Sequence, residues 1–289
     1  MHDVSTHSGK PKSMICGGRE FRWGERTYLM GVINLTPDSF SGDGLAGRSQ
    51  KAVELAQAFE AQGVDIIDVG GESTRPGHDP ITPKEEMERL LPVLEQIVSA
   101  VGVPVSVDTH RAEVARGALE AGASMINDVW GLKAEAELAS VAAQGKVPMV
   151  LMHNQPTTQY RDMFPEVMAS LDVSVERALR AGLSPEDIIL DPGIGFGKTA
   201  DHNLELLGRL SEIRALGYPL LVGTSRKSTI GLVLDLPVEE RLEGTAATVA
   251  LAIAGGADLV RVHDVREMFR VVRMSDAIVR GWRPQGWKR

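Results

Sequence analysis

The sequence predicts an α/β fold, a single-domain (β/α)8 TIM barrel with an N-terminal β-hairpin that closes the barrel floor. Eight short, almost continuous apolar runs recur along the 289 residues, and amphipathic segments separate them. Such runs suit strands that are buried on both faces of a parallel sheet. Eight β–α units without a break in composition favour one closed barrel. A doubly wound open sheet is the alternative.

Each element is assigned from its local pattern. The strands are predicted at 28–35, 65–71, 104–109, 124–130, 148–153, 187–193, 219–225 and 258–264. The clearest helix, at 87–98, repeats apolar residues with a period of about 3.6. Glycines such as Gly63 and Gly122 end helices just before the next strand. Turn residues within 14–27 predict the hairpin, so we assign 1–13 to a disordered tail, 14–282 to the barrel and 283–289 to a C-terminal tail.

Composition narrows the class of protein. A hydrophobic content of 43% allows a sizeable core. A net charge of −8 argues against nucleic acid or an anionic membrane as a partner, because both require a basic surface. The single Cys16 cannot form an intrachain disulfide, and the first residues lack the apolar core of a signal peptide. We therefore expect a cytoplasmic protein.

The stretch ILDPGIGFGKT, residues 189–199, resembles a phosphate-binding loop but departs from it. The Walker pattern requires a glycine where Pro192 stands, and proline has no N–H to donate. The three glycines at 193, 195 and 197 also miss the G-x-G-x-x-G spacing of dinucleotide-binding proteins. What remains is an acid, Asp191, at the exit of an apolar strand, followed by a pliant loop.

Polar residues follow all eight predicted strands, where barrels hold their chemistry. They are Asn34, Asp68 with Glu72, Asp108, Asn127, Met152 with His153, Asp191, Ser225-Arg226-Lys227, and Arg261 with His263. The cations follow the seventh and eighth strands, where barrels commonly bind a phosphate group. A salt bridge to Asp264 is the structural alternative for Arg261.

The acids Asp108 and Asp191, with Asn127 between them in the chain, suit a flat heterocycle with amino and ring N–H donors. The residues thus suggest a ligand with such a ring at one end and a phosphate at the other. A barrel metallohydrolase is an alternative, because several histidines could face the rim. The metallohydrolase interpretation lacks support, because such barrels usually carry a His-x-His on their first strand and this chain has Asn34 there.

Eight segments resemble the dihydropteroate synthase family, the folate-pathway enzymes that sulfonamides target. They are MGVINLTPDSFSGDG (30–44), DIIDVGGESTRPG (65–77), VSVDTHR (105–111), INDVWG (126–131), LMHNQ (151–155), ILDPGIGFGKT (189–199), LLVGTSRKS (220–228) and RVHDV (261–265). The resemblance implies a (β/α)8 barrel, Mg²⁺ and a homodimer. It implies a transferase that joins 6-hydroxymethyl-7,8-dihydropterin pyrophosphate to p-aminobenzoate, with release of pyrophosphate.

The resemblance also implies roles for individual residues. Its pterin pocket corresponds to Asp108, Asn127, Met152, Asp191, Phe196, Gly223, Lys227 and Arg261, with Arg261 stacked on the ring. Its pyrophosphate site corresponds to Asn34, Arg261 and His263, and Asn34 helps to place Mg²⁺. Its p-aminobenzoate site corresponds to Phe40, Thr74, Arg75, Pro76, Lys227 and Ser228. Asp108, Lys227, Arg261 and His263 are the implied catalytic residues.

Further expectations concern the loops. Lys198 is expected at the surface, where its helix begins. Loops 35–47 and 73–81 are expected to close over the pterin and create the p-aminobenzoate site, unless they are merely surface loops. The family usually reads S-F-S-D-G-G where this chain has Ser39-Phe40-Ser41-Gly42-Asp43-Gly44, which leaves the role of Asp43 open.

Two rival functions are weighed against the synthase. A pterin-dependent methyltransferase would share the barrel and pterin pocket, but would not need the cations after the last two strands. A catalytically inactive folate-binding protein would have lost some of the pocket positions that are filled here.

Overall fold

A computed structural model describes residues 11–35, 44–72 and 81–287. Its main sheet has eight parallel strands in the order β8-β7-β6-β5-β4-β3-β10-β9. These are β3 (Tyr28–Asn34), β4 (Ile66–Gly70), β5 (Val105–Asp108), β6 (Met125–Asp128), β7 (Met149–Met152), β8 (Ile188–Asp191), β9 (Leu221–Val222) and β10 (Leu259–Val262). All eight predicted strands are confirmed.

The sheet closes on itself between β8 and β9. A parallel bridge joins Leu190 to Leu220, and the Leu190 amide donates to the Pro219 carbonyl at 2.9 Å. The barrel prediction is therefore confirmed over the open-sheet alternative.

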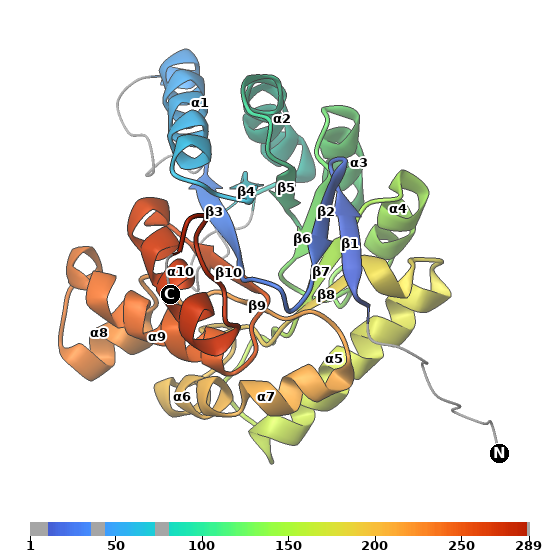
Figure 1. Ribbon diagram of the computed structural model, residues 1–289. Helices are drawn as coiled ribbons and strands as arrows, with labels where there is room; N and C mark the ends of the chain where they lie inside the picture. The colour runs from blue at the N-terminus through green and yellow to red at the C-terminus, as the bar shows by residue number, and fades with distance from the viewer. Residues whose placement is uncertain (1–10, 36–43, 73–80, 288–289) are drawn as a thin grey trace.

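Helices surround the ring of strands, as Figure 1 shows. They are α1 (Gly44–Ala61), α2 (Pro83–Ala100), α3 (Ala112–Glu120), α4 (Glu137–Gly145), α5 (Met163–Arg180), α6 (Ala200–Gly208), α7 (Leu210–Ile213), α8 (Ser228–Leu234), α9 (Leu242–Ala254) and α10 (Val265–Val279). Their apolar faces pack on the outward side chains of the strands, such as Leu29 and Ile67, and form the larger core. Among the described residues, no helix is long and apolar enough to span a bilayer.

The N-terminal hairpin closes one end of the barrel, as predicted. It consists of the antiparallel strands β1 (Ser13–Cys16) and β2 (Arg19–Arg22). The Cys16 thiol lies 3.2 Å from the carbonyl oxygen of Ser124, just before β6, which places the hairpin at the amino ends of the strands. Its inner side chains meet an apolar floor built from Met30, Ile66, Met125, Val150, Ile189, Leu221 and Leu259. This packing leaves the opposite end of the barrel open for a site.

The predicted N-terminal tail lies largely outside the described residues, whereas 283–287 of the predicted C-terminal tail are described. Strand β1 begins at Ser13 and helix α10 ends at Val279, close to the limits assigned to the barrel. Residues 1–10 and 288–289 are not described, so the division into tails and domain stays a prediction.

Candidate active site

A polar layer lies inside the barrel, directly above the apolar floor. Side chains alternate along a strand, so residues two positions apart face the same side. On β4, β6, β8 and β10, the residue two positions beyond the floor residue is polar. These four residues are Asp68, Asn127, Asp191 and Arg261. Three of these four are nearly or fully inaccessible to solvent, and Arg261 is half-buried. The sequence therefore places charge where a barrel would otherwise continue its apolar packing.

This layer forms the bottom of a pocket at the carboxyl ends of the strands. The space between its walls, including the opening to solvent, is about 420 Å³. Its lining residues are Val32, Asn127, Val129, Met152, Asp191, Ile194, Phe196, Gly223, Ser225, Lys227, Arg261 and His263. All the residues predicted for the pterin pocket except Asp108 line this space.

Four lining residues were missed by the sequence analysis as site residues: Val32, Val129, Ile194 and Ser225. Alternation along the strands could have found two of them, because Val32 and Val129 lie two positions beyond Met30 and Asn127. Ser225 was noted only as a polar residue at a strand end. Ile194 lies in the loop after β8, where side chains do not alternate as they do along a strand, so its direction could not be predicted from the sequence.

Arg261 is held by Asp68 of the polar layer and by Asp108 at the end of β5. Its Nε lies 2.7 Å from Oδ2 of Asp68, and its Nη2 lies 2.8 Å from Oδ2 of Asp108. The same Asp68 oxygen accepts a hydrogen bond from the Asn127 amide at 3.0 Å. Asp68 therefore orients a cation and an amide of the pocket at once. The sequence could have indicated this inward position, because Asp68 lies two residues beyond the floor residue Ile66 on β4.

The structural alternative for Arg261 is wrong. Asp264 pairs with Arg226, whose Nε lies 3.0 Å from the Asp264 carboxylate. Arg226 is thereby turned to the outer side of the rim, whereas Arg261 turns inward to Asp68 and Asp108. Arg261 is thus the cation that lines the pocket beside the acids.

Burial raises the pKa of Asp191, which lines the pocket, and of Asp108, which pairs with the pocket residue Arg261. It raises the pKa of Asp191 to about 6, against the opposing effects of the Gly193 amide and Lys227. It raises the pKa of Asp108 to about 7, with a further increase from Asp68, while Arg261 acts in the opposite sense. Perturbed acids in and beside one cavity are typical of functional sites, where burial and neighbouring charges are arranged to shift pKa values.

The glycine-rich loop after β8 wraps around Asp191. The Asp191 Oδ1 accepts the Gly193 amide at 2.7 Å. At Gly193, φ is +70°, and a β-carbon there would lie 1.9 Å from the His153 carbonyl oxygen. A side chain therefore cannot be accommodated, and the loop lies directly against the end of β7. The glycines serve this close packing rather than a phosphate cradle.

The surface position expected for Lys198 is wrong. The residue is 8% exposed, and its Nζ donates to the carbonyls of Gly193 and Phe196, both at 2.9 Å. It also lies 2.8 Å from Nδ1 of His153. Burial lowers the pKa of Lys198 to about 7, although Asp191 raises it. The loop folds back over the lysine, a tertiary contact that the local sequence did not reveal.

The opposite wall of the pocket comes from the loop after β9. Lys227 precedes α8, and its Nζ lies 4.1 Å from the centroid of the Phe196 ring. Ser228 is the first residue of α8 and is exposed. Met152 is 3% exposed at the end of β7, and Gly223 follows β9. Phe196 and Lys227 thus bring two loops together above the barrel.

His263 and Asn34 stand at the rim. The His263 Nδ1 lies 3.0 Å from the Ser225 hydroxyl. Burial and the charge of Arg261 lower the pKa of His263 to about 4, so the ring is neutral at pH 7. A β-carbon at Gly70 would lie 3.8 Å from Oδ1 of Asn34 and 3.5 Å from Cβ of Asp108, so both residues flank the end of β4.

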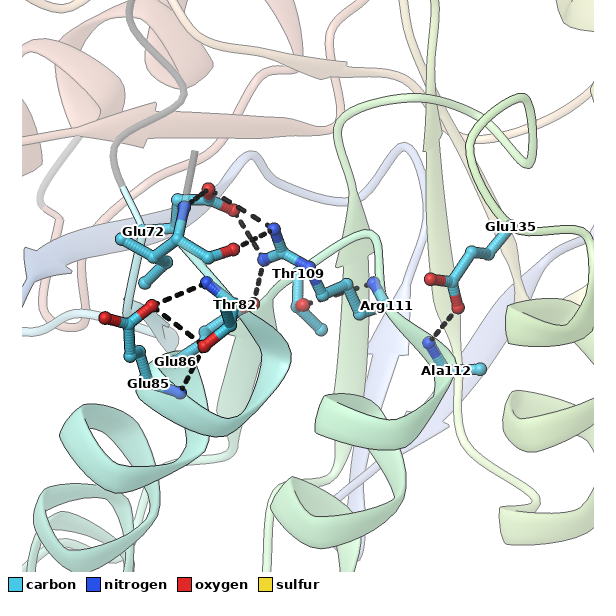
Figure 2. Close-up of polar contacts among 9 residues, drawn as sticks. Glu72, Thr82, Glu85, Glu86, Thr109, Arg111, Ala112 and Glu135 are labelled. Carbon is cyan, nitrogen blue, oxygen red and sulfur yellow. Dashed lines mark hydrogen bonds and ion pairs between the residues drawn. The ribbon is translucent and has the colours of Figure 1, made fainter. Parts of the chain in front are cut away.

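Arg111 anchors the connection between β4 and α2, as Figure 2 shows. Its Nη1 donates to Glu72 at 2.6 Å and also contacts Glu86, and its Nη2 donates to the Ile81 carbonyl at 2.8 Å. Glu72 in turn accepts the Ile81 amide at 3.0 Å. The two ends of the connection are therefore fixed to each other and to the start of α3.

Part of the predicted site lies outside the described residues. This applies to Phe40, Thr74, Arg75 and Pro76 of the predicted p-aminobenzoate site, and to Asp43. Lys227 and Ser228 are the members of that site that are described. No group of three or more His, Cys, Asp or Glu within 11–35, 44–72 and 81–287 could hold a metal ion by itself.

The fold is that of a barrel enzyme, with a pocket at the carboxyl ends of the strands that combines a buried carboxylate, an amide and a guanidinium. Residues 30–263 match the family model for pterin binding enzymes. The chain is 50% identical over 268 residues to the dihydropteroate synthase of Clostridium beijerinckii, covering 92% of this chain and 100% of that protein.

Solved structures agree with the sequence comparison. The Clostridium difficile dihydropteroate synthase, solved in the presence of pteroic acid, has a TM-score of 0.87 and 47% identity, covering 89% of this chain and 98% of that one. The Xanthomonas albilineans enzyme in complex with 7,8-dihydropteroate has a TM-score of 0.85 and 37% identity, with coverage of 92% and 98%. This chain therefore belongs to the pterin binding enzymes and, within them, to the dihydropteroate synthases, transferases of folate synthesis that act on small molecules.

Proposed function

We propose that the pocket binds the pterin of 6-hydroxymethyl-7,8-dihydropterin pyrophosphate and directs its condensation with p-aminobenzoate to 7,8-dihydropteroate and pyrophosphate. The observation that carries the proposal is the buried carboxylate of Asp191, which faces the pocket beside Asn127. A carboxylate accepts paired hydrogen bonds, as the guanidine-like edge of a pterin requires. Met152, Phe196 and Gly223 provide the walls between which a flat ring fits.

Arg261 serves both ends of this substrate. Its Nε and Nη2 are engaged by Asp68 and Asp108, and its side chain is 20% exposed. Because those acids fix its plane, Arg261 can present a face to the pterin ring and its remaining N–H groups to the pyrophosphate. His263, on the same strand end, adds a second donor for the phosphate oxygens.

Mg²⁺ fits this rim through Asn34. The ion prefers oxygen ligands and commonly takes few from the protein and the rest from water and substrate phosphates. Asn34 offers one amide oxygen beside the end of β4, so pyrophosphate would complete the coordination. A bound Mg²⁺ would offset the negative charge that grows on the leaving group.

The residues of the pocket favour departure of pyrophosphate as the main task. The C–O bond breaks with its electron pair on the pyrophosphate oxygen, and the amine nitrogen forms the new C–N bond and releases its proton to water. Arg261 and His263 stabilise the leaving oxygens, and such preorganised electrostatic effects dominate many enzymes. Asp108 stabilises the positive charge that spreads over the dihydropterin ring. The arylamine is neutral at pH 7 and needs no strong base.

p-Aminobenzoate binds after the pterin in this proposal. Lys227 and Ser228 contribute to its site, together with Phe40, Thr74, Arg75 and Pro76. Calorimetry tests the order: p-aminobenzoate is titrated into the enzyme alone, and into enzyme that holds 6-hydroxymethylpterin, Mg²⁺ and pyrophosphate. Binding is expected only in the second titration, and equal affinity in both would contradict an ordered reaction.

The overall reaction is tested by release of pyrophosphate. Release is expected when both substrates are present and is expected to require p-aminobenzoate. A methyltransferase or an inactive binding protein would release none. Chelation of magnesium should suppress the signal, and Asn34→Ala should raise the Mg²⁺ concentration needed to restore it.

We also propose that the chain forms a homodimer. Large exposed apolar side chains gather on α9 and α10, two helices that pack against each other: Leu251 is 65% exposed, Met274 63% and Ile278 73%. Apolar area of this kind often marks an interface between protein chains. Sedimentation equilibrium should give twice the chain mass, and Leu251→Glu should shift it toward the monomer. A monomeric wild type would contradict the proposal.

A further inference from the structure

The buried Lys198 is a charged group that the proposed reaction does not use. It lies behind the pocket rather than in its lining, and it follows directly the loop 193–197 that carries Ile194 and Phe196. A buried ammonium is costly unless it is fully hydrogen-bonded. The three acceptors nearest to its Nζ, at 2.8–2.9 Å, therefore show which parts of the structure Lys198 holds together.

Two of these acceptors belong to the loop itself. The Nζ bonds to the carbonyls of Gly193 and Phe196 bridge the first residues of the loop to its last turn. The Phe196 amide closes the same turn by donating to the Gly193 carbonyl at 3.1 Å. Lys198 thus links Gly193, which donates to Asp191, with Phe196, which forms a wall of the pocket.

The third acceptor ties the loop to β7. Nζ of Lys198 lies 2.8 Å from Nδ1 of His153. When Lys198 is protonated its Nζ has donors only, so Nδ1 accepts this hydrogen bond. The pKa of His153 is lowered to about 3 by burial and by the neighbouring Lys198, so its ring is neutral at pH 7 and can act as this acceptor. His153 follows Met152, another wall of the pocket.

The loop has little intrinsic order without such contacts. Three of its five residues are glycines with positive φ: Gly193 (+70°), Gly195 (+84°) and Gly197 (+56°). Glycine loses more conformational freedom on folding than any other residue. Hydrogen bonds from a side chain at the end of this loop therefore contribute more to its order than they would in a loop without glycines.

We propose that Lys198 is a positioning residue of the pterin pocket, which holds the loop 193–197 so that Phe196 and the Asp191 carboxylate keep the geometry that binds the ring. The inference rests on the proposed pterin site. Lys198 does not touch the substrate; it acts through the carbonyls of Gly193 and Phe196 and through His153.

The test compares Lys198→Met with Lys133→Met as a matched control. Lys133 also donates to a backbone carbonyl beyond β7, that of Asn154 at 2.6 Å, but this carbonyl is not part of the loop 193–197. Calorimetry measures the Kd of 6-hydroxymethylpterin and, separately, of pyrophosphate with Mg²⁺. Lys198→Met is expected to raise the pterin Kd by about tenfold or more, because it removes several buried hydrogen bonds at once. Its pyrophosphate Kd should stay within about twofold, and Lys133→Met should change neither.

The outcomes separate the inference from the proposed function. Failure of the wild type to bind the pterin contradicts the proposed function. If the wild type binds and a folded Lys198→Met binds equally well, the positioning role alone is overturned. Should Lys198→Met not fold, Lys198→Gln decides, because it keeps N–H donors but is too short to reach all three acceptors. A pterin Kd equal to that of the wild type in Lys198→Gln also overturns the role.

Discussion

Replacing Asp191 by Asn is expected to stabilise the empty protein while it removes pterin binding. Burial raises the pKa of Asp191 from its ordinary 3.8 to about 6. A carboxyl whose pKa is higher in the folded state binds its proton more tightly there. Its ionisation therefore destabilises the fold increasingly as the pH rises from 3.8 to 6, and by a constant amount above that range.

The magnitude follows from the shift. One pKa unit corresponds to about 1.4 kcal/mol, so ionised Asp191 costs roughly 3 kcal/mol of stability at pH 8 and about half of that at pH 5. Asn carries no charge, and its amide oxygen can still accept the Gly193 amide, which lies 2.7 Å from the native carboxylate. The free energy of unfolding of the variant should therefore exceed that of the wild type by about 1–3 kcal/mol at pH 8, and by clearly less at pH 5.

Pterin binding should change in the opposite direction. The Asn amide N–H₂ would face the donors of the ring, and each unpaired group costs about 1–3 kcal/mol. Calorimetry with 6-hydroxymethylpterin should show a loss of affinity of at least about tenfold.

Urea unfolding at pH 8 and pH 5 measures the stability difference, with Asp162→Asn as the control. Asp162 is the exposed N-cap of α5, a position where Asn and Asp are nearly equivalent. If Asp191→Asn raises the free energy of unfolding equally at both pH values, the ionisation of Asp191 does not destabilise the fold. Pterin affinity within about twofold of the wild type would refute the binding role of Asp191.

Three other outcomes are expected. Arg111→Met leaves buried carboxylates unpaired and should cost about 3–5 kcal/mol in urea unfolding, whereas Arg116→Met, which breaks an exposed pair, should cost at most about 1 kcal/mol. Gly193→Ala should abolish pterin binding in calorimetry because its β-carbon would lie 1.9 Å from a backbone carbonyl oxygen; Gly18→Ala, with a φ of +75° but open space around it, should bind normally. The low pKa of His263, about 4, keeps the ring neutral in the empty site, so pyrophosphate binding should raise that pKa and draw protons from solution. Calorimetry in two buffers of different ionisation enthalpy detects this uptake, and identical heats in both would count against a contact with His263.

The strands and the site at their ends were open to prediction from the sequence for a physical reason. Strands buried on both faces must be almost uniformly apolar, so a polar residue at the end of such a run is conspicuous. Asn127, Asp191 and Arg261 were found in this way, and the structure places all three at one pocket. The hairpin was equally accessible, because its turn residues identify it locally.

Side-chain partnerships were not accessible in the same way. Asp68 was noted at a strand end, but its partner Arg261 is 193 positions away along the chain. Arg226 and Arg261 both follow strands and both are arginines, yet one pairs outward with Asp264 and the other inward. Local sequence carries no information on this choice, because it depends on which acid the closed barrel brings within reach.

Lys198 marks the boundary between the two kinds of information. The sequence by itself determined that a glycine-rich loop follows Asp191 at a strand end, because apolar periodicity and glycine are local signals. Only the tertiary structure decided that the loop folds back over its own lysine, since His153 and two backbone carbonyls converge on Nζ. A lysine at the start of a helix is normally solvated, and burial becomes favourable only when three acceptors from two strand ends replace the water.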